Sequence, residues 1–315
     1  MSSIVTKPSY TPVIVLPACT GNEGPPAHLV SPVAEVDAYL NGYVAGLAIP
    51  GNLKEAVQYA LLGGGKRLRP VLAWHCAAAV GGKGPASLPG GAAVELVHAF
   101  SLVHDDLPAM DDDEVRRGRP TLHIARGEAM AILAGDLMLN MGFELLLANV
   151  QPAMLAGALC AELAAGTSGM IAGQVFDTLG GFEGGESDAE RLAIIHRHKT
   201  GALIRAACRM GAQCGMGSAT GHGLLAITTY ADAVGLMFQI VDDILDVTQP
   251  AEHVGKKTGK DVQAGKLTYP GVLGLEQARA EVKRTLRVAL EAIKPLGPAA
   301  KPLAELAEYM AVRTK

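Results

Sequence analysis

The sequence predicts an all-α protein folded as a single-domain helical bundle. Apolar residues recur at helical spacing along most of the chain, and no segment alternates apolar and polar residues as a half-buried strand would. Of the 315 residues, 49% are hydrophobic and only 18% are charged, which is enough apolar material for one large core. The order of the elements therefore favours helices packed on helices.

The chain is expected to begin with a mobile arm, residues 1–30, followed by one helical domain, residues 31–315. Five prolines in the arm interrupt regular structure. Helical spacing starts near Pro32, and Pro50 with Gly51 ends this first helix. Its apolar positions are Val33, Val36, Leu40 and Val44.

The remaining helices follow from the same spacing, with connectors rich in glycine or proline between them. The segment 129–147 is apolar almost all round, which is typical of a helix at the centre of a bundle. Further helices are expected at 53–62, 71–80, 92–106, 152–179, 194–210 and 276–314, with connectors at 81–91, 120–128 and 180–187.

Composition and charge argue against several classes of protein. The net charge is −4 and the basic residues form no separate patch, so no nucleic-acid partner is expected. Five cysteines, with no CxxC, argue against a disulfide framework or a zinc site and favour a cytoplasmic location. No uninterrupted apolar run reaches about 18 residues and no secretory signal is evident, so neither a transmembrane helix nor a membrane partner is expected.

A dense acidic cluster ends the helix predicted at 92–106. Carboxylates in such a place repel one another unless cations lie among them. Their hard oxygens favour Mg²⁺, which commonly completes its shell with substrate phosphate, and neighbouring arginines suit further phosphate oxygens. A solvated acidic loop balanced by arginines is the alternative. The cluster comprises Asp105, Asp106, Asp111, Asp112, Asp113 and Glu114, followed by Arg116, Arg117 and Arg119.

A second acidic cluster, DDILD at 242–246, ends another apolar helix. Its aspartates are three and four residues apart, which places them on one helical face. In the first cluster Pro108 separates Asp105 from Asp111, so that helix must end or bulge for Asp111 to rejoin the other carboxylates. Two such clusters in one chain favour metal-bridged phosphate over a solvated loop.

Three further stretches combine cations with glycine. GGGKRLRP, residues 63–70, places three cations where a glycine backbone can approach an anion, although a basic helix C-cap is the alternative. In HRHKTG, residues 196–201, a lysine and a threonine before glycine are typical of a helix kink. The basic, glycine-rich run 253–266 has few apolar anchors and is expected to form a flexible lid.

Four motifs together resemble the trans-prenyltransferases that make linear isoprenyl diphosphates: GGGKRLRP, DDLPAMDDDEVRRG, HRHKTGALIRAA and FQIVDDILD. The resemblance covers residues 30 to 315, with the motifs in the family's order, and within the family it is strongest to bacterial farnesyl diphosphate synthases. It implies a bundle of the isoprenoid synthase type around a central cavity, a homodimer, and three bound Mg²⁺ ions.

The resemblance also implies roles for individual residues. The metal ligands are expected to be Asp105, Asp111 and Asp242, with Asp106, Asp243 and Asp246 acting through water or as orienting groups. Isopentenyl diphosphate is expected to be held by Lys66, Arg69, His98 and Arg117, although a lone helical histidine is more often structural. The allylic diphosphate is expected to contact Arg116, Lys199, Lys256 and Lys266. The expected catalytic group is Lys199, Thr200, Gln239 and Arg116.

The implied reaction breaks the allylic carbon–oxygen bond while cations stabilise the leaving diphosphate, and the double bond of isopentenyl diphosphate attacks the resulting cation. A class I terpene cyclase uses the same metal chemistry, but it needs no GGGKRLRP site and normally has a longer Asn/Ser/Glu motif in place of the second DDxxD. A non-catalytic subunit of a heteromeric prenyltransferase would lose one or both aspartate motifs, and this chain keeps both.

Product length is expected to depend on the residues about one turn before the first aspartates. Phe100 lies five residues before Asp105, where a phenyl ring would block the cavity, and Ser101 lies four residues before it. In the resembling family an aromatic residue at this place goes with farnesyl diphosphate, and a small or flexible one with geranylgeranyl diphosphate. The resemblance therefore implies the fifteen-carbon product, with the twenty-carbon product as the alternative.

Overall fold

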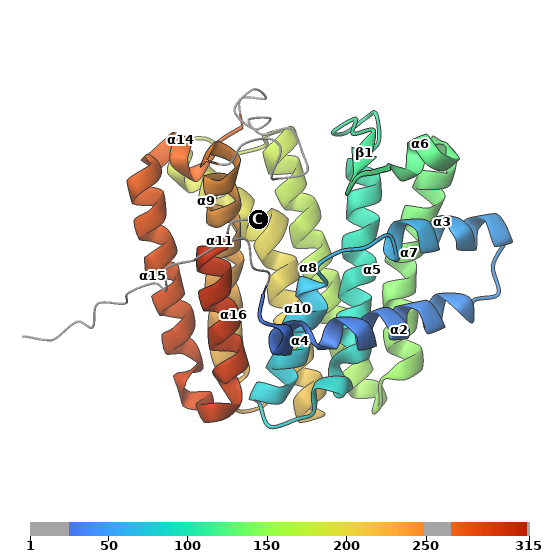
Figure 1. The fold of residues 1–315 in the computed structure, drawn as a ribbon, viewed down its shortest axis with the longest axis horizontal. Coiled ribbons are helices and arrows are strands. Elements are labelled where there is room, and N and C mark those ends of the chain that lie inside the picture. The colour runs from blue at the N-terminus through green and yellow to red at the C-terminus, as the bar shows by residue number, and fades with distance from the viewer. Residues whose placement is uncertain (1–24, 249–265, 314–315) are drawn as a thin grey trace, which may run out of the picture.

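The structure is a computed structural model that describes residues 25–248 and 266–313. These residues form an all-α bundle, so the predicted fold class is confirmed (Figure 1). The helices are α1 (Ala27–Val30), α2 (Pro32–Ala45), α3 (Gly51–Leu61), α4 (Leu68–Ala79), α5 (Leu88–Asp105), α6 (Leu122–Arg126), α7 (Glu128–Asn149), α8 (Ala153–Thr178), α9 (Asp188–His196), α10 (Ala202–Met216), α11 (Leu224–Thr248), α14 (Tyr269–Leu273), α15 (Leu275–Ile293) and α16 (Lys301–Val312). Short helical turns are η1 (Gly84–Ser87), η2 (Arg197–Gly201) and η3 (Lys294–Ala300).

The long helices run side by side, and α2 and α3 cross in front of α5 and α7 (Figure 1). Helix α5 packs mainly on α7 and α4, while α11 packs mainly on α15 and α10. Helix α10 supplies Leu203 and Met210 to the core around α5 and α7. It also supplies Ile204 and Cys208 to the core around α11, α15 and α16. One helix thus contributes to both cores.

Glycines let the helices that carry the polar motifs approach closely. A side chain at Gly173 of α8 would come within 2.0 Å of the backbone nitrogen of Lys199. A side chain at Gly235 of α11 would come within 3.0 Å of Gly201. The helix predicted at 194–210 is divided by η2, a wider π-helical turn that contains Lys199 and Thr200. Lys199 and Thr200 are therefore held between α8 and α11.

The structure corrects two expectations about the chain's organisation. Val115–Arg116 (β1) and Arg119–Pro120 (β2) pair as a small antiparallel hairpin, although no hairpin signal was evident. Gly118, with φ of 73°, supplies the conformation that this tight turn requires. Residues 1–24 of the predicted arm lie outside the described residues, but α1 is helical and buries Leu29, so the domain begins before residue 31.

Helix length and composition also correct the expectation that no segment could span a membrane. The segment 84–105 and the helices α7, α8 and α11 are long and apolar enough to do so. Scattered polar residues interrupt the apolar runs of these helices, so none of them appears as one unbroken apolar segment. Between 39% and 67% of each apolar window is buried inside the bundle, so helix packing accounts for part of this apolar surface.

Candidate active site

The first acidic cluster lies where α5 ends, beside β1 at the upper edge of Figure 1. The chain turns after Asp105, and the backbone N–H of Asp111 donates to the carbonyl of Asp105 at 2.9 Å. Pro108 lies within this turn. The predicted break in the helix is therefore confirmed, and it returns Asp111 to the neighbourhood of Asp105.

Asp106 faces away from solvent and is bound by an arginine. Its carboxylate accepts from Arg116 Nε at 2.8 Å and from Nη2 at 2.6 Å, and only 3% of the residue is exposed. Such a two-pronged ion pair compensates a buried carboxylate. Asp106 is thus held by Arg116 in this structure, and the predicted contact of Arg116 with the allylic diphosphate stays a prediction.

Asp105 is the acidic group whose titration is most altered. Burial raises the pKa of Asp105 to about 6, the neighbouring Asp111 and Asp106 add to the rise, and Lys199 and Arg116 oppose it. The nearby cations therefore do not fully compensate the negative charge of an ionised Asp105 in this structure. A bound cation would supply that charge and displace the proton.

The second acidic cluster, near the end of α11, also divides between orienting and available carboxylates. Asp243 is buried and accepts from His196 at 3.1 Å and from the backbone N–H of Tyr269 at 2.9 Å. Asp242 is half-exposed and forms an ion pair with Arg313. Asp246 lies one turn further along and is half-buried. The predicted division between Asp242 as a direct metal ligand and Asp243 as an orienting group stays a prediction.

A group of lysines lies opposite, on η2 and before α14. Lys199 Nζ donates to Asp177 of α8 at 2.7 Å, and Lys266 Nζ lies 3.4 Å from the same carboxylate. Burial alone would raise the pKa of Asp177, but the two lysines lower it. Thr200 donates to Gln239 at 2.9 Å, which joins two predicted catalytic residues. Lys256 lies outside the described residues, so its predicted role stays a prediction.

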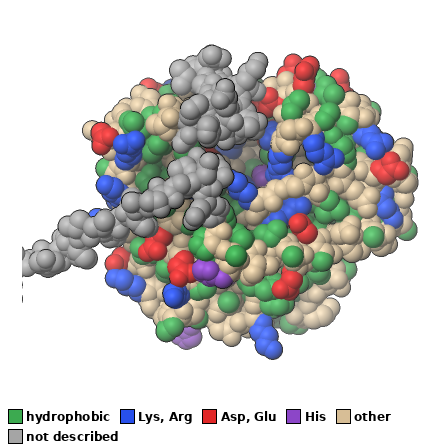
Figure 2. Space-filling view, in the orientation of Figure 1, with side chains coloured by type: hydrophobic (Ala, Val, Ile, Leu, Met, Phe, Trp, Pro, Cys, Tyr) green, Lys and Arg blue, Asp and Glu red, His purple; other side chains and the backbone are tan. Residues whose placement is uncertain are grey.

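Two arginines of the first acidic motif, Arg117 and Arg119, lie close to the glycine run 63–65. Arg117 donates to the carbonyl of Gly64, and a side chain at Gly65 would come within 2.9 Å of the same guanidinium. A side chain at Gly63 would come within 2.7 Å of Arg119. A side chain at Gly63 would also lie 2.8 Å from the backbone carbonyl of Tyr59, and Gly64 and Gly65 have φ of 92° and 150°, so the backbone favours glycine at all three positions. Figure 2 shows a group of Lys and Arg side chains on this front face, beside the grey residues.

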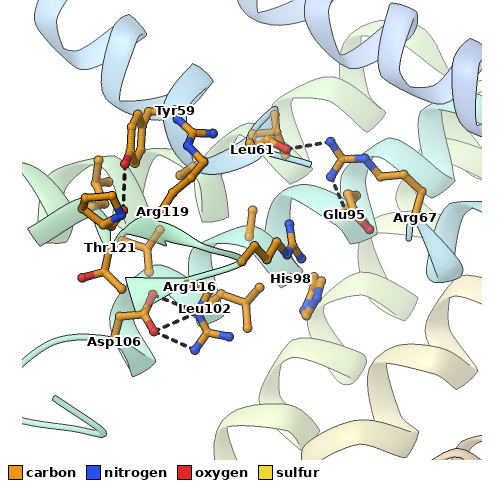
Figure 3. A pocket seen from close by; sticks show the side chains of 17 residues that line it. Tyr59, Leu61, Arg67, Glu95, His98, Leu102, Asp106, Arg116, Arg119 and Thr121 are labelled. Carbon is orange, nitrogen blue, oxygen red and sulfur yellow. Dashed lines mark hydrogen bonds and ion pairs between the residues drawn. The ribbon is translucent and has the colours of Figure 1, made fainter. Parts of the chain in front are cut away.

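His98 lies in a small cleft of about 60 Å³ between α3, α5 and the hairpin (Figure 3). Burial lowers the pKa of His98 well below its ordinary value, and Arg69 and Arg117 lower it further. The imidazole is therefore neutral near pH 7 and can both donate and accept one hydrogen bond. Two other residues predicted to hold isopentenyl diphosphate, Arg69 and Arg117, thus lie within electrostatic reach of His98.

The other cations of GGGKRLRP have different surroundings. Lys66 is exposed and lines a separate, mainly apolar pocket with Phe238 and Arg313. Arg67, which had no assigned role, is buried against Glu95 and Asp37 at 2.8 and 2.7 Å, so it is structural. Figure 3 shows this pair on one side of His98 and the Arg116–Asp106 pair on the other.

Phe100 lies on the face of α5 that packs on α7. Its ring meets His104 edge to face, with centroids 5.2 Å apart, and His104 approaches Gly135 of α7. Phe100 is 8% exposed. Ser101 is half-buried, and its hydroxyl donates to the carbonyl of His98. The aromatic ring is thus firmly packed below the first acidic motif.

The acidic donors suit a metal that is completed by substrate. Within 25–248 and 266–313, no three acidic, histidine or cysteine side chains converge closely enough to hold a metal by themselves. Mg²⁺ is commonly bound by one or two carboxylates together with waters and substrate phosphates. Such a site fits Asp105, Asp111 and Asp242. Within the part of the chain that the structure describes, none of these three carboxylates is held by a two-bonded arginine pair as Asp106 is. Asp106 and Asp243 are already satisfied by protein donors.

Two residues that contact this site, His196 and Arg313, are not predicted from the sequence. His196 lies inside HRHKTG, but its partner Asp243 is 47 residues away. Arg313 binds Asp242 from 71 residues away and lies over the ring of Phe238, 4.3 Å from its centroid. The motif itself is the only local signal for His196, and no local signal marks Arg313.

Known proteins resemble this chain over most of its length. The family described as "Polyprenyl synthetase" matches residues 50–301. "Geranylgeranyl pyrophosphate synthase 11, chloroplastic" of Arabidopsis thaliana is 43% identical over 294 residues, which cover 91% of this chain and 82% of that protein.

Two solved structures have the same fold over nearly their whole length. A geranyltransferase from Legionella pneumophila has a TM-score of 0.78 and 31% identity, and the match covers 90% of this chain and 95% of that one. A putative farnesyl-diphosphate synthase from Marinomonas sp. MED121 has a TM-score of 0.74 and 37% identity, with 92% and 100% covered.

Proposed function

Because the chain belongs to the polyprenyl synthetase family and is a prenyltransferase, we propose that it condenses isopentenyl diphosphate with an allylic diphosphate. The products are a longer linear trans-prenyl diphosphate and free diphosphate. One observation carries this proposal: Lys199 and Lys266 share the carboxylate of Asp177, and a separate cationic group, Arg69 and Arg117, acts electrostatically on His98. Two groups of this kind suit two diphosphate substrates.

In this proposal each group binds one substrate. Arg69, Arg117 and the neutral His98 hold isopentenyl diphosphate, with Lys66 at the edge of the same loop. Lys199 and Lys266 draw charge onto the allylic diphosphate as its carbon–oxygen bond breaks. Thr200 and Gln239 direct their dipoles toward the reacting carbons. Asp106 and Arg116 keep each other in place, so Arg116 acts by orientation.

We propose that Asp105, Asp111 and Asp242 hold Mg²⁺, with three ions expected and Asp246 acting through water. The metal would supply positive charge to the leaving diphosphate. A product assay with isopentenyl diphosphate and dimethylallyl or geranyl diphosphate tests the whole proposal. A cyclic hydrocarbon would instead identify a terpene cyclase, and the lack of any product would favour a non-catalytic subunit.

Two product lengths are candidates. The Arabidopsis relative and one from Capsicum annuum, 44% identical over 273 residues, are both named geranylgeranyl pyrophosphate synthases, which favours the twenty-carbon product. Phe100 favours fifteen-carbon farnesyl diphosphate, because its buried ring lies below the aspartates where a growing tail would pass. The names support geranylgeranyl diphosphate at least as well as this one residue supports farnesyl diphosphate.

Phe100→Ala is expected to lengthen the main product by at least one five-carbon unit. Removing the ring opens space beside α7, and Leu96, one turn further back, becomes the next obstacle. Chromatography of the dephosphorylated products measures the length. Ser101→Ala is the matched control and should leave the length unchanged. An unchanged product from Phe100→Ala would show that the floor lies elsewhere.

We also propose a homodimer formed through α7 and α8. Among the described residues, six of the thirteen exposed large apolar side chains lie on these two adjacent helices. Apolar surface of this extent commonly marks an interface. The six residues are Ile132, Leu133 and Leu147 of α7, and Met154, Ile171 and Val175 of α8.

The wild-type protein is expected to have the mass of two chains in light scattering at micromolar concentration. The double variant Leu133→Arg/Ile171→Arg should have the mass of one chain, because two charges on the apolar face oppose its burial. Leu225→Arg, at an 80% exposed position on α11, is the control and should stay dimeric. A monomeric wild type would contradict the proposal.

A further inference from the structure

The carboxylate of Asp243 is surrounded by donors from three segments of the chain. His196 Nε2 donates to Oδ2 at 3.1 Å, and the backbone N–H of Tyr269 donates to the same oxygen at 2.9 Å. Gln239 Nε2 donates to Oδ1 at 3.3 Å. Asp243 is 4% exposed and His196 is 6% exposed, so these bonds lie out of water. Hydrogen bonds in such surroundings are strengthened.

His196 is held in one orientation. Its ring stacks on the ring of Tyr269, with centroids 5.5 Å apart and 16° between the planes. An ionised carboxylate only accepts hydrogen bonds, so Nε2 of His196 must carry the proton. The imidazole is thus fixed by stacking on one side and aims a donor at Asp243.

The same carboxylate joins the two sides of the candidate active site. His196 directly precedes η2, which carries Lys199 and Thr200. Thr200 donates to Gln239 at 2.9 Å, and Gln239 donates in turn to Asp243. Hydrogen bonds therefore connect Thr200 of η2 through Gln239 to Asp243 on α11. Asp243 is bonded in turn to His196, and the backbone leads from His196 directly into η2.

We propose that His196 is a positioning residue for prenyl transfer. The hydrogen bond from His196 holds Asp243 in place. It thereby fixes the position, relative to η2, of the turn of α11 that carries Asp242 and Asp246. This inference rests on the proposed function. The simpler alternative is a histidine that only fills the core. His75 is such a residue, since it is buried and its Nε2 bonds the carbonyl of Leu29 at 2.8 Å.

Two substitutions separate the donor from the shape of the side chain. His196→Gln keeps a nitrogen donor at about the reach of Nε2, whereas His196→Phe keeps a ring against Tyr269 and removes the donor. His75→Phe is the matched control, because it also removes a buried Nε2 donor but lies outside the Asp243 network. If His196→Phe does not fold, His196→Asn, whose donor is one methylene shorter, takes its place.

The measurements are kcat, the KM of each substrate, and the calorimetric affinity for Mn²⁺ in the presence of inorganic pyrophosphate. Loss of a residue that orients a metal-binding group commonly costs about 10- to 100-fold in activity or metal affinity. We expect a loss of that size in kcat and Mn²⁺ affinity for His196→Phe, with the KM of isopentenyl diphosphate little changed. His196→Gln should recover most of both, and His75→Phe should lower only the melting temperature.

The proposal is wrong if His196→Phe keeps its turnover and Mn²⁺ affinity, or if His196→Gln falls as far as His196→Phe. A wild-type protein that forms no prenyl product would overturn the proposed function instead. The Mn²⁺ and pyrophosphate titration needs no turnover, so it distinguishes these two failures.

Discussion

Replacing Asp105 or Asp242 with alanine is expected to lower prenyl transfer by several orders of magnitude while the protein stays folded. Burial and the neighbouring carboxylates raise the pKa of Asp105 to about 6, so nearby cations do not fully compensate its negative charge. Asp242 is the half-exposed carboxylate of the second motif and is not enclosed by protein donors as Asp243 is. Removing either one weakens cation binding where the leaving diphosphate gains charge.

Initial rates with Mg²⁺, Mn²⁺ and excess chelator measure this effect, and thermal melts check folding. Glu114→Ala is the matched control, because Glu114 is an exposed acidic residue of the same segment and is outside the predicted ligand set. Its rate should stay close to that of the wild type. Undiminished turnover in excess chelator would end the metal proposal.

Arg67→Met is expected to lower the free energy of unfolding by about 3–5 kcal/mol, as is typical when one partner of a buried ion pair is removed. The side chains of Arg67 and Glu95 are 3% and 5% exposed. Arg67 also donates to Asp37 at 2.7 Å and to the carbonyl of Leu61 at 2.7 Å. The substitution therefore leaves the Glu95 carboxylate in the core without its nearest cation.

Urea unfolding followed by circular dichroism measures the loss. The double variant Arg67→Met/Glu95→Leu should regain most of the stability, because the buried charge is removed together with its partner. Lys294→Met, which breaks an exposed pair with Glu291, is the control and should cost less than about 1 kcal/mol. A loss of that small size for Arg67→Met would show that the pair is not buried in solution.

The sequence predicted most helices to within a few residues, because apolar spacing and breaking residues are local properties. The helix at 129–147 is α7, and the segment 152–179 is α8. The break after Asp105 also followed from one residue, Pro108. The β1–β2 hairpin did not, because only two residues on each side are paired and the surrounding residues are charged.

The chemically important groups can all be read from local sequence: two acidic motifs on apolar helices, a glycine run with cations, and a lysine and threonine within a helical segment. Which of these groups already have partners within the protein depends on contacts between distant segments. Arg116 is engaged by Asp106, and Asp243 by His196 and Tyr269. Helical spacing shows which carboxylates share a face. It does not show which carboxylate will be buried by a distant segment. A buried carboxylate is stabilised only if the protein itself supplies hydrogen-bond donors to it.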